Sequence, residues 1–125
     1  MITKLKKVMS SFEEKYGSLI VFAVFKMDEF VDRWSLVVSS NSIDKITSEK
    51  EREERFDYLF DLLTKELSEE ESASIGRIGF FNTENYLIKE LRNNYKVDVT
   101  DTEKKIMNVK INGNTVSEGF ILKAI

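Results

Sequence analysis

Two clusters of hydroxyl and amide side chains stand where predicted strands end, and they are the first candidates for a ligand site. They are Ser39, Ser40, Asn41 and Ser42 after WSLVV, and Asn82, Thr83, Glu84 and Asn85 after SIGRIGFF. A helical crossover between the two strands makes them parallel and brings both clusters to one sheet edge. Ligands of open α/β sheets bind at that edge, where helix N–H groups favour anions. The alternative is that these residues only form turns and cap helices.

Arg77 lies in the middle of the predicted strand SIGRIGFF, among apolar residues. A guanidinium can hold a carboxylate or a phosphate through two parallel hydrogen bonds, so we include Arg77 in the candidate ligand site. The alternative is that Arg77 pairs with an acid of the neighbouring strand or extends to solvent at a strand edge. The sequence contains neither GxGxxG nor a P-loop, and it therefore predicts no specific phosphate-binding loop.

Three acids in MDEFVDR, namely Asp28, Glu29 and Asp32, are the candidate metal ligands. Carboxylate oxygens are the ligands that Mg²⁺ or Ca²⁺ requires, although this spacing does not match an EF-hand loop. The alternative is a solvated acidic turn. The chain has no histidine and no cysteine, which removes the usual general base, the thiolate nucleophile and most zinc sites. We therefore expect no catalytic residue and no cofactor, with Mg²⁺ or Ca²⁺ as the alternative.

The overall charge argues against a nucleic-acid partner. The net charge is -3 and the pI is about 5.2, whereas binding to a phosphate backbone depends on clustered lysine and arginine. The apolar run at residues 19–25 is too short to span a bilayer. Glu13 and Glu14 separate that run from the N-terminal lysines, which does not fit a signal peptide. We expect a cytoplasmic protein that binds neither nucleic acid nor membrane.

Apolar spacing predicts the elements of the first half of the chain. Apolar residues recur every three or four positions over residues 2–16, which predicts a helix ended by Gly17. The apolar run 18–25 predicts a buried central strand. The stretch WSLVVS, residues 34–39, predicts a second strand in an antiparallel hairpin, with Trp34 facing the core.

The second half begins with the longest predicted helix. Ser48 and Glu51 have the spacing of a capping box, and an apolar stripe follows as far as Leu67. The stretch LSEEES then ends the helix. Residues 74–81 predict a third strand, and residues 82–95 predict a third helix because N-cap residues precede apolar positions at helical spacing.

The C-terminal segment predicts a β-hairpin. Residues 105–111 and 115–125 flank Asn112 and Gly113, the dipeptide best suited to a two-residue type I′ turn. Residues 97–99 predict a brief strand before it. The whole chain, residues 1–125, is therefore expected to be a single α+β domain of two or three layers. Its order is α-β-β-α-β-α-β-β, with a mixed sheet of undetermined strand order.

The apolar C-terminal strand suggests a function through association. Phe120, Leu122 and Ile125 are candidate interface residues, because an edge strand there can pair with another subunit or with a peptide. The alternative is that this strand completes the domain's own sheet. We favour a non-catalytic protein-binding or self-associating module, with a homodimer formed through this hairpin or a helix face. The alternative function is a small-ligand or nucleotide-binding protein, or a metal-assisted hydrolase, that uses the two polar loops.

The segment DRWSLVVSS, the helix EREERFDYLFDLLTKELSEEE and the strand SIGRIGFFN together resemble a group of small prokaryotic α/β proteins. These proteins have a W-[DS]-L-V-V-S strand in the same context. The resemblance covers residues 19–92. It implies an α/β arrangement of strands and helices and carries no activity or site residue.

Overall fold

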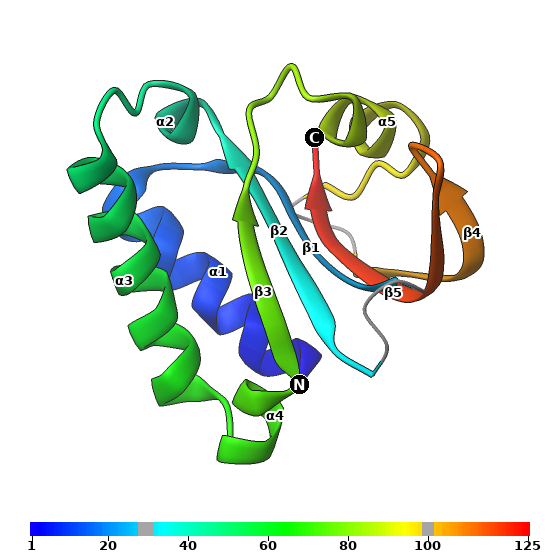
Figure 1. Cartoon of the computed structure of the whole chain (residues 1–125), viewed down its shortest axis with the longest axis horizontal. Helices are drawn as coiled ribbons and strands as arrows, with labels where there is room; N and C mark the ends of the chain where they lie inside the picture. Colours follow the sequence, from blue (N-terminus) through cyan, green and yellow to red (C-terminus); the bar gives the residue numbers. More distant parts are fainter. Residues whose placement is uncertain (28–31, 99–101) are drawn as a thin grey trace.

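The fold is built on a five-stranded mixed sheet with the order β3-β2-β1-β5-β4 (Figure 1). The computed structural model describes residues 1–27, 32–98 and 102–125. The strands are β1 (Leu19–Met27), β2 (Trp34–Ser40), β3 (Ile75–Phe80), β4 (Lys104–Ile111) and β5 (Asn114–Ala124). β2 and β3 are parallel, and the other neighbouring strands are antiparallel. The edge strands of this sheet are therefore β3 and β4.

Helices lie on both faces of the sheet. α1 (Ile2–Tyr16) and α3 (Glu49–Glu66) are on one face, and α5 (Tyr86–Asn94) is on the other (Figure 1). The short helices α2 (Asn41–Asp44) and α4 (Glu69–Ala73) precede and follow α3. The fold is therefore α+β, and the order of the longer elements confirms the predicted α-β-β-α-β-α-β-β order.

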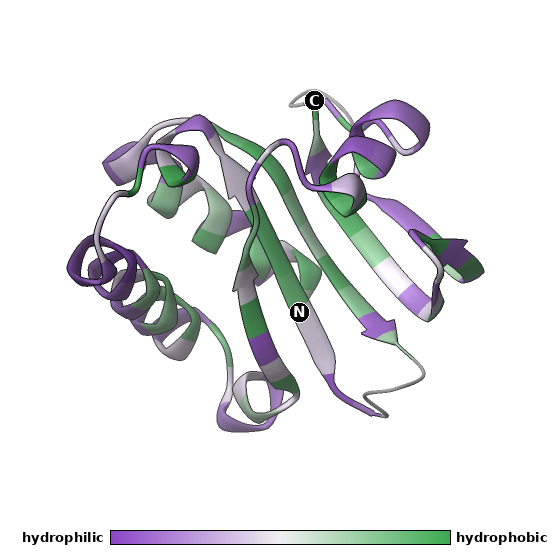
Figure 2. Ribbon diagram, turned by 45° about the horizontal axis from the view of Figure 1, so that its top comes forward, coloured by the Kyte–Doolittle hydropathy of each residue, from purple (hydrophilic) through white to green (hydrophobic). Residues whose placement is uncertain are grey.

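One apolar core lies between α1 and the sheet. The helix buries Leu5, Val8 and Phe12, which share one face because they recur every three or four residues. They pack with Phe22 of β1 and Leu36 of β2. The alternation of β2 places Trp34 in the same cluster, as the sequence predicts. Figure 2 shows the hydrophobic colouring of these central strands.

A second core lies on the opposite face, under α5. Leu87, Ile88 and Leu91 of this helix are buried against Ala23 and Phe25 of β1. Because β1 is covered on both faces, nearly every residue of the strand is buried, which explains its uninterrupted apolar sequence. The two-sided burial holds β1 in the middle of the molecule.

The predicted turn and helix ends are confirmed. Asn112 and Gly113 have φ angles of 51° and 79°, as a type I′ turn requires. Gly17 follows α1 with φ of 89°, a conformation that costs a glycine little. Ser48 caps α3 by accepting a hydrogen bond from the Glu51 backbone N–H at 3.2 Å.

The region after α3 differs from the sequence prediction. LSEEES was expected only to end the helix, but Ser68 and Glu71 form a capping box that opens α4. The first polar cluster also differs from the expected loop, because residues 41–44 form the short helix α2 directly after β2. Val97 makes a single bridge to Ala124 in place of a strand, and residue 99 of the predicted brief strand lies outside the described residues.

Candidate functional site

The two polar loops lie next to each other at the C-terminal ends of β2 and β3, and side-chain hydrogen bonds connect them. β2 and β3 are parallel, so both loops leave the same end of the strand pair. The Thr83 backbone N–H donates to Asp44 Oδ1 at 3.0 Å, and the Thr83 hydroxyl donates to Asp44 Oδ2. Asp44 was not singled out from the sequence, because nothing distinguishes it there from other surface acids.

The remaining polar groups of these loops also have local roles. Ser40 Oγ accepts from the Ile43 N–H at 3.0 Å and caps α2. Ser42 Oγ accepts from Arg55 at 3.3 Å, and Asn82 Oδ1 accepts from the Glu84 N–H at 2.8 Å. The Ser40 and Asn82 contacts are the cap and turn interactions that the sequence alternative describes, whereas the Ser42 contact joins the loop to α3. Asn41 opens α2 and is exposed.

Ser39 is the exception among these loop residues. Its side chain is fully buried, and its hydroxyl has no hydrogen-bond partner among the described residues. A buried hydroxyl without a partner loses its hydration and gains nothing in return. The buried Ser39 hydroxyl therefore lowers the stability of the folded state.

The predicted metal ligands are only partly described. Asp28 and Glu29 lie outside the described residues. Asp32 is in a turn before β2, with φ of 63°. Within the ranges that the structure describes, no group of three histidine, cysteine or acidic side chains is arranged to hold a metal ion.

The three candidate interface residues of the C-terminal strand have different environments. β5 lies between β1 and β4, so its backbone is paired on both sides. Leu122 is buried, and the Phe120 ring lies 5.9 Å from that of Trp34. Ile125 alone is well exposed, at 41%, and its carbonyl accepts a hydrogen bond from Arg92. The unpaired strand edges belong to β3 and β4.

The edge strand β3 and the neighbouring side of α3 form a larger exposed apolar area. No residue of β3 is buried. In α3 only Leu59 and Leu63 are buried, whereas Phe56 and Phe60 are 39% and 51% exposed and stack with ring centroids 6.4 Å apart. We name this area the β3–α3 surface, defined by Arg52, Glu53, Phe56, Phe60, Ile78 and Phe80.

Two hollows lie along the β3–α3 surface. The first, of about 300 Å³, is lined by Glu49, Arg52 and Glu53 at the start of α3 and by the end of β3. The second, of about 530 Å³, is lined by Arg33, the end of α3 and the start of β3. In the first hollow Arg52 donates to the Phe80 carbonyl at 2.9 Å. Both ends therefore carry both signs of charge, with Glu49, Arg52 and Glu53 at the first hollow and Arg33 and Glu69 at the second.

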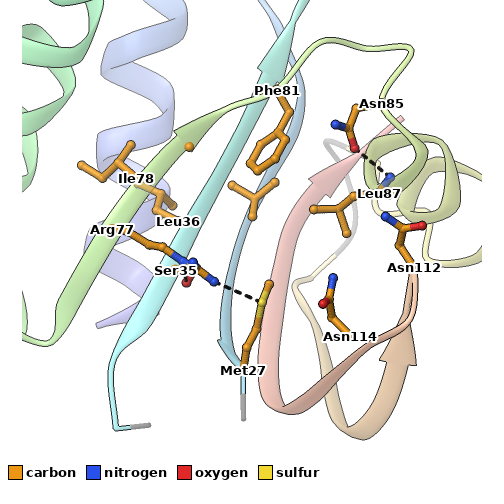
Figure 3. A pocket seen from close by; sticks show the side chains of 12 residues that line it. Met27, Ser35, Leu36, Arg77, Ile78, Phe81, Asn85, Leu87, Asn112 and Asn114 are labelled. Atoms are coloured by element: carbon orange, nitrogen blue, oxygen red, sulfur yellow. Dashed lines mark hydrogen bonds between the residues drawn. The ribbon is translucent and has the colours of Figure 1, made fainter. Parts of the chain in front are cut away.

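A separate cavity of about 290 Å³ lies on the opposite face of the sheet. Figure 3 shows Arg77 and Ser35 on one side of it and Asn112 and Asn114 on the other. Arg77 Nε donates to Ser35 Oγ at 2.7 Å. Of the candidate ligand residues, Arg77 alone lines this cavity, and the loop clusters contribute only Asn85.

Comparisons with protein-family models, with curated proteins and with solved structures find no significant match to this chain. No helix in the described part of the chain combines the length and the apolar character needed to cross a membrane.

Proposed function

We propose that the protein is a non-catalytic self-associating module, and that a second copy of the chain binds to the β3–α3 surface. The observation that carries this proposal is the edge strand β3, which has no buried residue and lies beside the exposed stacked pair Phe56 and Phe60. An unpaired strand edge next to exposed aromatic rings is a recurrent site of association.

The packing of α3 supports this choice of surface. This helix contacts α1 extensively, but only Leu59 and Leu63 of its residues are buried. Ile78 and Phe80 on the facing side of β3 are only partly buried. A partner that covers both elements removes these apolar side chains from water, at about 25 cal/mol for each Å².

A two-fold axis through β3 suits the charges of this surface. An antiparallel β3–β3 pair extends the sheet across two chains. It places the start of α3 in one chain near the end of α3 in the other chain. Arg33 at one end of the surface then approaches Glu49 and Glu53 of the second copy, and Glu69 approaches Arg52 of the second copy. Each chain supplies both members of the pairing, which is the condition for a closed symmetric dimer.

The size of the surface sets the expected affinity. The 18 residues of α3 span about 27 Å, and a strip about 15 Å wide gives roughly 400 Å² on each chain. That is the size of a weak or transient interface. We expect dissociation in the micromolar range, and not the nanomolar range of larger permanent interfaces.

Sedimentation velocity over a concentration series tests the proposal. The 14.6 kDa chain should approach twice its mass as the concentration rises from about 5 to about 500 μM. The double change Phe56→Ser with Phe60→Ser should keep the mass monomeric over the same range, because it removes the exposed aromatic pair. Both rings are exposed, so the loss of folding stability should be small.

A matched control is available on α5. Tyr86 is 77% exposed and lies outside the β3–α3 surface, so Tyr86→Ser should associate like the wild type. A wild-type chain that stays monomeric throughout would disprove self-association. A dimer that persists in the double variant would show that another surface mediates it.

A further inference from the structure

The pairing of β3 with β2 shows which backbone groups of β3 face its free edge. The Phe81 N–H donates to the Val38 carbonyl of β2 at 2.9 Å, so residue 81 directs its backbone groups toward β2. Successive residues of a strand direct these groups to opposite edges, and the register with β2 is regular from Arg77 to Phe80. The N–H and C=O groups of Ile78 and Phe80 therefore face the free edge, where a second strand would pair.

One of these edge groups already has a hydrogen-bond partner. Arg52 of α3 donates through a terminal guanidinium nitrogen to the Phe80 carbonyl at 2.9 Å. The same guanidinium lies 5.8 Å from the centre of the Phe80 ring, which is within the range of a cation–π contact. A single side chain of α3 therefore covers both the carbonyl and the ring of Phe80, at the place where a second β3 would pair.

The contact between Arg52 and Phe80 is of intermediate strength. A hydrogen bond from a charged donor is stronger than one between neutral groups. Arg52 is exposed, however, and competing water and the loss of side-chain freedom reduce the net gain from an exposed contact. The release of Arg52 therefore lowers the affinity of a weak dimer by a measurable factor and still allows the dimer to form.

A second chain replaces only part of what the release removes. A backbone N–H of the second β3 can bind the Phe80 carbonyl, but the guanidinium then loses both of its contacts with Phe80. In the two-fold arrangement the released Arg52 approaches Glu69 of the second copy. Both side chains are exposed, and an ion pair between exposed side chains contributes little. The contact in the monomer therefore opposes association on balance.

We propose that Arg52 regulates self-association by closing the free edge of β3 in the monomer. This inference rests on the proposed function, because it requires that a second copy pairs with β3. Strand pairing displaces the guanidinium from the Phe80 carbonyl, and a backbone N–H of the second chain takes its place. Charged side chains at an exposed edge limit unwanted strand pairing. Arg52 therefore keeps the chain monomeric at low concentration and leaves it able to dimerise at high concentration.

Sedimentation velocity of the full chain with Arg52→Met tests this inference. Methionine retains an apolar side chain beside Phe80 but has no N–H donor, and the exposure of Arg52 means that the fold should be kept. We expect this variant to dimerise about fivefold more tightly than the wild type. Lys50→Met is the matched control, because Lys50 is an exposed cation of α3 that lines neither hollow. Its dimer affinity should equal that of the wild type.

The outcomes separate this inference from the proposed function. If the wild type dimerises and Arg52→Met dimerises equally or more weakly, the inference is overturned and the proposed function stands. If the wild type stays monomeric and Arg52→Met dimerises, Arg52 closes the edge as inferred, and self-association of the wild type is overturned. If both stay monomeric up to about 500 μM, both proposals are overturned. Equally tightened association in Lys50→Met would show a general effect of charge on α3 and would also overturn the inference.

Discussion

Lys123 of β5 is a buried cation, and its partner comes from a distant part of the sequence. It is 3% exposed, and its Nζ lies 2.7 Å from Glu13 Oε2 at the end of α1. The same carboxylate oxygen accepts the Leu19 N–H at 2.8 Å. Glu13 therefore joins the end of α1, the start of β1 and the last strand.

Glu13→Ala should destabilise the fold by about 2–3 kcal/mol. The change leaves Lys123 buried without a counter-ion, which costs about 3–5 kcal/mol in fully buried pairs and less here because Glu13 is partly exposed. Urea unfolding measures the difference. The exposed neighbour Glu14 is the control, and Glu14→Ala should change stability by less than about 0.5 kcal/mol. Equal effects of the two changes would contradict the role of the pair.

Ser39 and Ser40 are adjacent, but their hydroxyls should have opposite effects on stability. Ser39 Oγ is buried without a partner among the described residues, so Ser39→Ala should be neutral or stabilising by up to about 1 kcal/mol. Ser40→Ala removes the cap of α2 and should cost about 1 kcal/mol. Thermal unfolding of the two variants tests this order. A larger loss in Ser39→Ala would mean that its hydroxyl makes a contact absent from the structure.

We expect the acid stability of the α4 region to depend on Glu71. Its side chain closes the capping box with Ser68 and forms ion pairs with Lys4 and with the amino group of Met1. The hydrogen bond from Lys4, and then that from the Ser68 backbone, lower the pKa of Glu71 from 4.5 to about 2. The ionised form of the Glu71 carboxyl is therefore more stable in the folded state than in the unfolded chain.

This depressed pKa predicts a pH dependence of unfolding. The contribution of Glu71 is fully present above pH 4.5 and is lost as the pH falls toward 2. Glu71→Gln should therefore lower the melting temperature at pH 6, and its difference from the wild type should shrink as the pH falls through this window. Calorimetry at several pH values measures it. A difference that stays constant from pH 6 to pH 2 would contradict the ionic role of Glu71.

The sequence predicts the longer elements well because their signals are local. The 3.6-residue period of α1, the apolar run of β1 and the Asn112 and Gly113 turn each depend on neighbouring residues. The Ser68 capping box also has a local signal, but the acidic LSEEES stretch resembles a helix end. Strand order has no local signal, since any of the strands could pair at either edge of β1.

The candidate sites are less predictable, because they depend on long-range contacts. Residue type predicts polar loops after β2 and β3, and the parallel strand pair does bring them together. It does not predict that Asp44 joins them through Thr83. The cavity beside Arg77 draws residues from four strands, a helix, a turn and a loop, so no sequence spacing marks it.

The two edges of the sheet differ in exposure and charge. β4 has exposed Lys104 and Lys105, and charged residues of this kind discourage strand pairing. β3 has Arg77 as its only charged residue, and its apolar side chains lie beside Phe56 and Phe60 of α3. Association is therefore expected at β3 and not at β4.

Amide hydrogen exchange at low and high protein concentration tests the β3–α3 surface most directly. If a second chain pairs with β3, peptides covering residues 75–81 and 52–64 should exchange more slowly at about 500 μM than at about 5 μM. Peptides covering residues 104–111 of the other edge strand should exchange equally at both concentrations. Unchanged exchange over residues 75–81, in a sample shown to be dimeric, would contradict the proposed interface.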